Sequence, residues 1–184
     1  MLSPDRLTVK SSEALNDALS LARRNGNPVA HDAHLLRVML DQQEGIVVPI
    51  LQKLGVAVPQ LRDQLDAEIA RYPKQTDASP ALSRELTQVL DGAENIAKSL
   101  GDEYVSIEHI LVALADTRGS ESAALLKPIG VTRTSLLEAL KSVRGAHKVT
   151  DQTPENQYQA LQKFTRDLTD MARKGKLDPV IGRD

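Results

Sequence analysis

Apolar residues recur three or four positions apart along most of the chain, which is the spacing of one face of an α-helix. Ser79 followed by Pro80 predicts the start of the clearest helix, and Gly101 predicts its end. The apolar stripe between them consists of Leu86, Val89, Leu90, Ala93, Ala97 and Leu100. Strict alternation of apolar and polar residues, the pattern of a half-buried strand, is not found.

Three more helices are predicted after Gly101. Ser106 is expected to cap the first of them, the second runs over about 121–129 and stops at Gly130, and the third starts near Thr132 or Thr134. The first half of the chain has the same scheme. Its first helix is expected to begin at Thr8 and to end at Gly26, and its second is expected to begin near His31-Asp32. The third is expected to end at Gly55, and the fourth is expected to begin at Pro59.

The two halves match when the chain is shifted by 75 residues against itself. The register needs no gap from residue 7 to residue 65, and 13 of these 59 positions are identical. The identities include Gly26 with Gly101 and His34 with His109, which chance matches among Leu and Ala do not explain. The sequence therefore predicts an internal duplication.

The predicted fold class is all-α, with two pseudo-symmetric four-helix repeats in one compact eight-helix domain. A unit of about 60 residues is marginal alone, so the two copies should bury their apolar stripes against each other. We assign residues 1–145 to this domain, with the copies at about 4–72 and 79–145. A polar linker is expected over 146–157 because the stretch 144–157 is polar and contains Gly, Pro and Thr, and a further short helix with Leu161, Phe164, Leu168 and Met171 follows it.

Composition narrows the function classes. The net charge of −2 and an aromatic content of 2% argue against nucleic acid as a partner. Cysteine is absent, which excludes disulfides and thiolate sites. Neither a signal peptide nor a stretch long enough to span a membrane is recognisable, so a cytoplasmic protein is expected. The one Gly-Lys pair, Gly175-Lys176, lacks the rest of a phosphate-binding loop, so no ATP binding and no enzyme activity are expected of this chain.

Two groups of polar residues could carry chemistry. His31 and His34 could bind a metal and support a hydrolase, but structural roles are favoured because no third ligand is apparent. Asp102, Glu103 and Glu108 could form an acid-base group, yet their position beside a helix start favours capping and helix-dipole interactions. The apolar run Ile46-Val47-Val48 is interpreted as core rather than as an exposed patch.

The duplicated elements "NGNPVAHDAHLL" and "LGDEYVSIEHIL" resemble the Clp N-terminal repeat family. Within it, "VTDQTPENQYQALQKFTRDLT" and "DRLTVKSSEAL" are most similar to the ClpB-type disaggregases. Residues 158–184, ending in "DPVIGRD", look like the segment that leads into the first AAA+ ATPase module. The resemblance covers nearly the whole chain.

The resemblance implies a substrate-engaging domain of a hexameric, ATP- and Mg-dependent threading machine that works with the DnaK system. The chain alone would be a monomer without cofactor or metal, and would bind unfolded or aggregated polypeptides through an apolar groove. The positions that match residues tied to substrate engagement are Thr8, Leu90, Asp102 and Glu108, and His109 would alter the polarity of the groove. Leu90 fits a groove and a core position equally well. The alternative is an adaptor-docking domain of a ClpA- or ClpC-type unfoldase.

Overall fold

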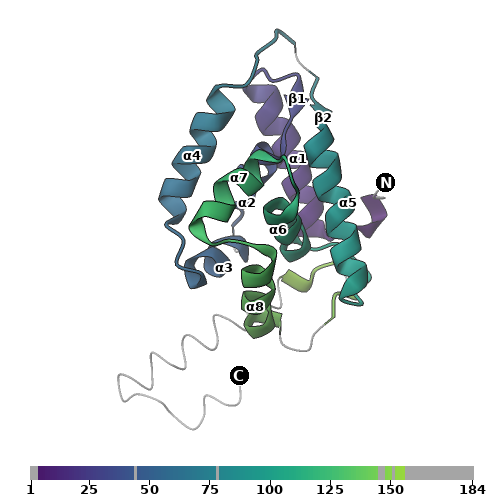
Figure 1. The fold of residues 1–184 in the computed structure, drawn as a ribbon. Helices are drawn as coiled ribbons and strands as arrows, with labels where there is room; N and C mark the ends of the chain where they lie inside the picture. The colour runs from purple at the N-terminus through teal and green to yellow at the C-terminus, as the bar shows by residue number, and fades with distance from the viewer. Residues whose placement is uncertain (1–3, 44, 78, 145–147, 151, 156–184) are drawn as a thin grey trace, which may run out of the picture.

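A computed structural model describes residues 4–43, 45–77, 79–144, 148–150 and 152–155. Eight α-helices and two very short strands lie within these ranges, which confirms the all-α fold class (Figure 1). The first copy contains a short 3-10 helix at Pro4–Arg6, α1 (Val9–Arg24), β1 (Val29–Ala30), α2 (Asp32–Met39), α3 (Val47–Lys53) and α4 (Val58–Ala70). The second contains β2 (Ala81–Leu82), α5 (Arg84–Ser99), α6 (Ile107–Asp116), α7 (Glu121–Leu126), a 3-10 turn at Lys127–Ile129 and α8 (Arg133–Arg144).

Equivalent residues start and end the first helix of each copy. The Thr8 side chain accepts a hydrogen bond from the Ser11 N–H, and the Ser83 side chain accepts one from the Leu86 N–H, so both serve as N-caps. The two glycines that follow α1 and α5, Gly26 and Gly101, both have φ of +74°. Only glycine adopts this conformation without strain, which confirms the predicted helix ends.

The start of α5 corrects one prediction. Ser79 is not its N-cap, because Ser83 has that role and Ala81–Leu82 between them forms β2. Strand β2 pairs in parallel with β1, with Val29 opposite Ala81 and Ala30 opposite Leu82. A strand of two residues is too short to show alternation, so its sequence could not reveal it.

The two copies are joined by crossed backbone pairing. Leu82, in the segment before α5, pairs with Ala30 in the loop of copy 1. Leu7, in the segment before α1, forms the equivalent parallel bridge with Val105 of copy 2. The Val105 N–H donates to the Arg6 carbonyl at 2.7 Å, and the Thr8 N–H donates to the Val105 carbonyl at 3.0 Å. The segment before the first helix of each copy therefore finds its backbone hydrogen-bond partners in the other copy.

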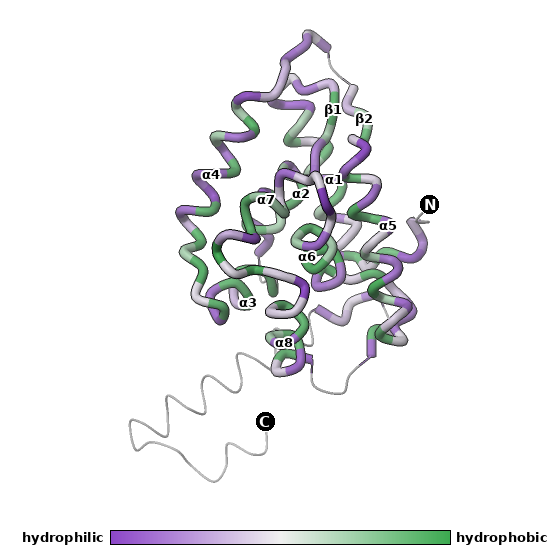
Figure 2. The backbone as a smooth tube through the Cα atoms, viewed as in Figure 1, coloured by the Kyte–Doolittle hydropathy of each residue, from purple (hydrophilic) through white to green (hydrophobic). Residues whose placement is uncertain are grey.

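The core lies between the copies and is centred on α6. Eight of the ten residues of this helix are buried, and Figure 2 shows its mostly apolar sequence at the centre of the domain. Helix α5 packs against α6 and α1 packs against α2, so equivalent helix pairs build the two halves of the core. Ile46 and Val47 are buried, which confirms their interpretation as core residues.

The chain after α8 folds back onto the domain. We call residues 148–150 and 152–155 the exit segment; Val149 and Glu155 in it are buried. A free linker would expose them, so the described part of the predicted linker packs against the domain, while residues 146, 147, 151, 156 and 157 of that prediction lie outside the described residues. The helix and module start predicted within 158–184 lie outside the described residues.

None of the described helices is long and apolar enough to span a membrane.

Candidate functional site

An apolar groove of about 400 Å³ lies between α1 and α5. Leu7 and Leu82 contribute from the segments before these helices, and Leu15 and Leu90 contribute from the helices themselves. The remaining lining residues are Pro4, Ser12, Asn16, Thr87 and Asp91. Apolar side chains that converge from four segments can hold apolar parts of a ligand without demanding a particular hydrogen-bond pattern.

The groove lies on the pseudo-two-fold axis of the duplication. Eight of its lining residues form four pairs that are 75 positions apart: Leu7 with Leu82, Ser12 with Thr87, Leu15 with Leu90 and Asn16 with Asp91. Two pairs are identical, one conserves a hydroxyl group, and the last differs by one negative charge. A chain lying in this groove would meet nearly the same surface in either direction.

Leu90 combines the two roles that its sequence position left open. Its side chain is 7% exposed and belongs to the core cluster, yet it also lines the groove. Of the five predicted substrate-binding residues, it is the one among the groove-lining residues.

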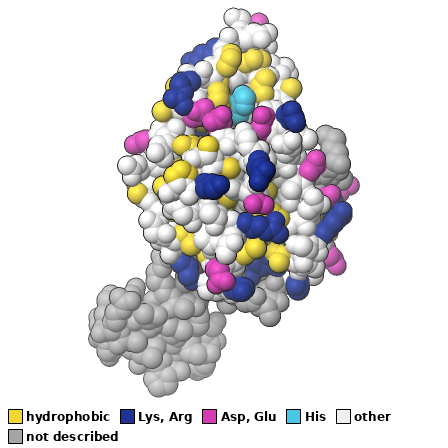
Figure 3. Space-filling view, in the orientation of Figure 1, with side chains coloured by type: hydrophobic (Ala, Val, Ile, Leu, Met, Phe, Trp, Pro, Cys, Tyr) yellow, Lys and Arg dark blue, Asp and Glu magenta, His cyan; other side chains and the backbone are white. Residues whose placement is uncertain are grey.

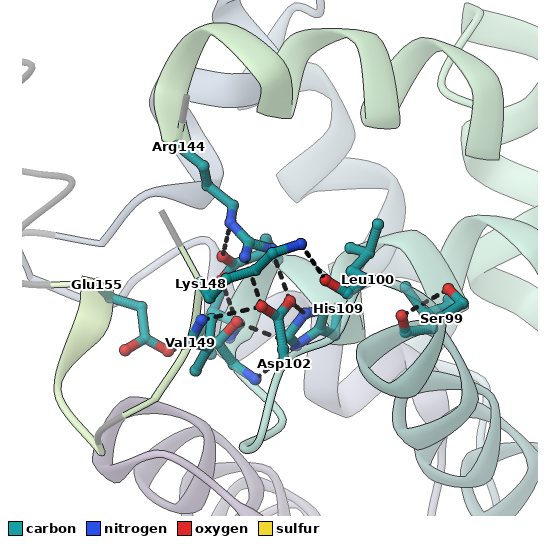
Figure 4. Close-up of polar contacts among 12 residues, drawn as sticks. Ser99, Leu100, Asp102, His109, Arg144, Lys148, Val149 and Glu155 are labelled. Carbon is teal, nitrogen blue, oxygen red and sulfur yellow. Dashed lines mark hydrogen bonds and ion pairs between the residues drawn. The ribbon is translucent and has the colours of Figure 1, made fainter. Parts of the chain in front are cut away.

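The other four predicted residues belong to a buried polar cluster that joins α6, α8 and the exit segment (Figure 4). Asp102 is its centre. Its Oδ1 accepts hydrogen bonds from Arg144 Nη2 at 2.7 Å and from the Val149 N–H at 2.9 Å. Its Oδ2 accepts from Arg144 Nη1 at 2.8 Å and from His109 Nε2 at 2.7 Å. The Arg144 contact is thus bidentate, which is the strongest arrangement for this pair.

This arrangement decides the charge of Asp102. Burial alone would raise its pKa, but the hydrogen bonds from His109 and Arg144 outweigh burial and hold the pKa well below its usual range. The His109 ring must carry its proton on Nε2, because its Nδ1 accepts from the Ser106 N–H at 2.9 Å. An ionised Asp102 and a correctly oriented His109 therefore support each other.

A second carboxyl group of the cluster comes from the exit segment. Glu155 Oε1 accepts from the Thr8 hydroxyl at 2.7 Å and from the Ile107 N–H, at the start of α6, at 3.1 Å. Burial, and after it the nearby Glu108 carboxylate, raise the pKa of Glu155 to about 7. Glu108 itself is hydrogen-bonded by Ser106 and lies 3.6 Å from Arg144 Nε.

The buried cluster explains the acidic residues without an acid-base reaction. Asp102 and Glu108 lie in it, and the predicted capping role is met by Ser106 and His109. Thr8, Asp102, Glu108 and His109 are all at most 5% exposed. In this conformation a bound polypeptide could not reach them, so their direct substrate contact stays a prediction that requires the exit segment to move away.

Sequence reasoning missed Arg144 and Glu155, although the repeat register holds a signal for the first. Arg144 is equivalent to Ile69, Glu108 to Ala33 and Asp102 to Asn27. Three charges at positions where the other copy is neutral indicate a buried charged cluster that is specific to copy 2.

His34 has the structural role that the sequence favoured. Its Nδ1 accepts from the His31 N–H at 2.8 Å and its Nε2 lies 2.9 Å from Asn27 Oδ1. Burial, with a smaller contribution from His31, lowers its pKa to about 4, so the ring is neutral at pH 7. In the part of the chain that the structure describes, no group of three His, Cys, Asp or Glu side chains could hold a metal ion.

Two interlocked four-helix repeats with an axial groove define a Clp-type N-terminal domain. The profile of the Clp repeat (R) N-terminal domain matches residues 6–129, and the chain belongs to this family. Over 179 residues it is 46% identical to the chaperone protein ClpB of Mycobacterium tuberculosis, which covers 96% of this chain and 21% of that protein. The chain thus spans about a fifth of the length of the curated relatives it matches.

Solved structures have the same fold. The Hsp104 N-terminal domain from Candida albicans superposes with a TM-score of 0.71 at 19% identity, covering 81% of this chain and 98% of that one. A ClpV N-domain in complex with a VipB peptide has a TM-score of 0.60 at 26% identity, covering 74% of this chain and 86% of that one.

Proposed function

We propose that this chain is the substrate-engaging N-terminal domain of a ClpB-type disaggregase and that it binds unfolded or aggregated polypeptides in the groove between α1 and α5. The observation that carries the proposal is the groove itself, whose Leu7, Leu15, Leu82 and Leu90 offer apolar contacts from four directions. Such a surface suits weak binding of many sequences, because it fixes few polar atoms of its ligand.

The two-fold pairing of the groove supports this function further. An unfolded chain presents its apolar side chains in no fixed direction, so a groove that is nearly equivalent in both directions can accept such a chain in either orientation. Asp91, opposite the neutral Asn16, is the one charged difference and would favour a basic residue at its own end.

A second candidate function is the docking of a defined partner, as in ClpA- or ClpC-type unfoldases. It is supported by the ClpV N-domain in complex with a VipB peptide, a relative 26% identical to this chain. A docking site for one partner should bind it tightly and discriminate against unrelated unfolded chains.

The family relation supports the wider setting. We propose that the full-length protein is a cytoplasmic hexamer that uses ATP and Mg²⁺ in modules following this domain and cooperates with the DnaK system. The mixture of positive and negative side chains on the face in Figure 3 suits a protein partner rather than a nucleic acid.

The groove is tested by binding of fluorescently labelled, unfolded casein to the 184-residue chain. Leu90→Ser and Leu15→Ser should each weaken binding by about tenfold, which is about 1.4 kcal/mol, because each replaces part of the apolar groove wall with a polar side chain. Ile129→Ser is the matched control, since Ile129 is 42% exposed and outside the groove.

Melting temperatures of the three variants separate loss of binding from loss of folding. Equal affinities of folded Leu90→Ser, Leu15→Ser and wild type would rule out the groove as the site. Strong binding of one folded partner, with none of casein, would favour the second candidate.

A further inference from the structure

The exit segment is held by both copies through its backbone and through the side chain of Lys148. The Val9 N–H at the start of α1 donates to the Gln152 carbonyl at 2.8 Å, and the Glu103 N–H donates to the Val149 carbonyl at 2.8 Å. The Lys148 ammonium group donates to the Leu100 carbonyl at the end of α5 at 2.6 Å. The segment therefore bridges the first helix of copy 1 and the loop after α5 of copy 2.

Side chains add a second set of contacts at each end of the segment. At one end, Asp102 accepts the Val149 N–H while Arg144 holds the Asp102 carboxylate. At the other end, Glu155 reaches back to the Thr8 hydroxyl and the Ile107 N–H. Figure 4 shows Arg144, Asp102 and Val149 close together, with Glu155 extending from the exit segment toward the same cluster.

Copy 1 holds its own following segment without charges. The Asn27 amide, equivalent to Asp102, donates to the Pro73 carbonyl at 3.0 Å, and the Gln75 N–H donates to the Gly26 carbonyl at 2.7 Å. Ile69 and Ala33 occupy the positions of Arg144 and Glu108. In the intact domain, copy 1 therefore retains the chain after its fourth helix through neutral groups.

Buried charges are costly, and a pair of them is often no more stabilising than an apolar replacement. The Asp102 carboxylate, however, accepts four hydrogen bonds from Arg144, His109 and Val149, so a displaced arrangement would leave a buried charge without its partners. The charges present in copy 2 are thus better suited to fixing the path of the exit segment than to adding stability.

We infer that Thr8, Asp102, Arg144 and Glu155 form an exit clamp, in which Arg144 and Glu155 are positioning residues that fix the direction in which the chain leaves the domain. Glu108 and His109 support the clamp by contacting Arg144 and Asp102. The identity of the module that the clamp would position rests on the proposed function. The existence of the clamp does not. Substitutions at Thr8 or Asp102 would then affect substrate handling because they release the exit segment. They would not remove a direct contact with the substrate.

Trypsin cleavage after Lys148 tests the clamp, because this bond lies within the docked segment. The 184-residue chain is digested at pH 6.5 and cleavage at this bond is followed by mass spectrometry. Glu155→Ala and Arg144→Gln should raise its rate at least tenfold. Glu155→Gln, which keeps an acceptor oxygen for Thr8 and Ile107, should retain most of the protection.

The matched control is Glu138→Gln on α8, which removes an exposed ion pair with Lys141 and should leave cleavage after Lys148 unchanged. Melting temperatures identify a variant that fails to fold, and Glu155→Ala keeps the test decisive if Arg144→Gln does so. Cleavage rates within twofold of wild type for both folded variants would overturn the clamp, and so would equal rates for Glu155→Ala and Glu155→Gln.

Casein binding separates the clamp from the groove. Leu90→Ser should weaken binding but leave Lys148 protected, whereas Glu155→Ala should expose Lys148 but leave binding to the groove intact. Unchanged casein binding by folded Leu90→Ser contradicts the proposed function alone, and continued protection of Lys148 in folded Glu155→Ala contradicts the clamp alone.

Discussion

Glu155 shows how much one side chain depends on its surroundings in this domain. Its carboxyl group is buried beside a second carboxyl group, Glu108, and its Oε1 is held by Thr8 and the Ile107 N–H. The hydrogen bonds favour the charged form, but burial and Glu108 disfavour it more strongly. Asp102 shows the opposite balance, because Arg144 and His109 donate directly to its carboxylate.

At the residue scale we predict a pH dependence of the docked exit segment. The pKa of Glu155 is about 7 in the folded chain and about 4.5 in water, so the docked state favours the protonated form. The preference is complete below about pH 4.5 and is lost as the pH rises through 7. The ¹³C resonance of the Glu155 carboxyl should titrate with a midpoint near 7.

The Glu155→Gln variant, which lacks this carboxyl group, identifies its resonance. The charged group that raises the pKa of Glu155 is Glu108 on α6, which itself lies 3.6 Å from Arg144 Nε on α8. A Glu155 midpoint near 4.5 would mean that its carboxyl is in water and that the exit segment is not docked.

At the scale of single elements, the helix starts are set by short local contacts. Thr8 and Ser83 cap α1 and α5 from equivalent positions, while His34 and His109 each accept a backbone N–H at the starts of α2 and α6. The histidines recur in the repeat because this position needs an acceptor for the N-cap N–H and a donor for Asn27 or Asp102.

The corrected start of α5 leads to a prediction at this scale. Ser83→Ala should lower the free energy of unfolding by about 1 kcal/mol, because the Leu86 N–H would lose its acceptor. Ser79→Ala should change it by less than about 0.5 kcal/mol, since Ser79 is exposed and outside the helix. Urea denaturation measures both, and equal effects of the two substitutions would restore Ser79 as a candidate cap.

At the scale of the whole molecule, the duplication produces one interlocked body. The segment before each first helix pairs with the loop of the opposite copy, and the groove forms between α1 and α5, one helix from each copy. Neither the pairing nor the groove exists in one copy alone.

Separated halves should therefore not fold. Residues 1–77 and 79–184, prepared as two polypeptides, should each show much weaker helical circular dichroism than the intact chain and no cooperative thermal transition, because each loses the partner that covers its apolar stripe. Mixing the halves should restore part of the helical signal. A cooperative transition in either half alone would contradict the interlocked arrangement.

The groove could be predicted in part from the sequence. The repeat register pairs Leu15 with Leu90 and Leu7 with Leu82, but periodicity cannot tell a stripe that faces the core from one that also borders a cavity. Leu90 does both, which is why its position in the sequence fits a groove residue and a core residue equally well. For the buried cluster, the register extended to the ends of the copies singles out Arg144 and Glu108 as charges without a charged counterpart, but it holds no information on Glu155, which follows the second copy.

The sequence by itself determined the duplication, the eight helices, most of their caps and the family, because spacing, capping and glycine conformation are local properties of the chain. Only the tertiary structure decided that the exit segment folds back, that Thr8 and Glu155 meet across 147 positions, and that Asp102 and Glu108 are buried while Glu103 is exposed. These contacts depend on which surfaces exclude water once both copies have packed, and no local pattern encodes that.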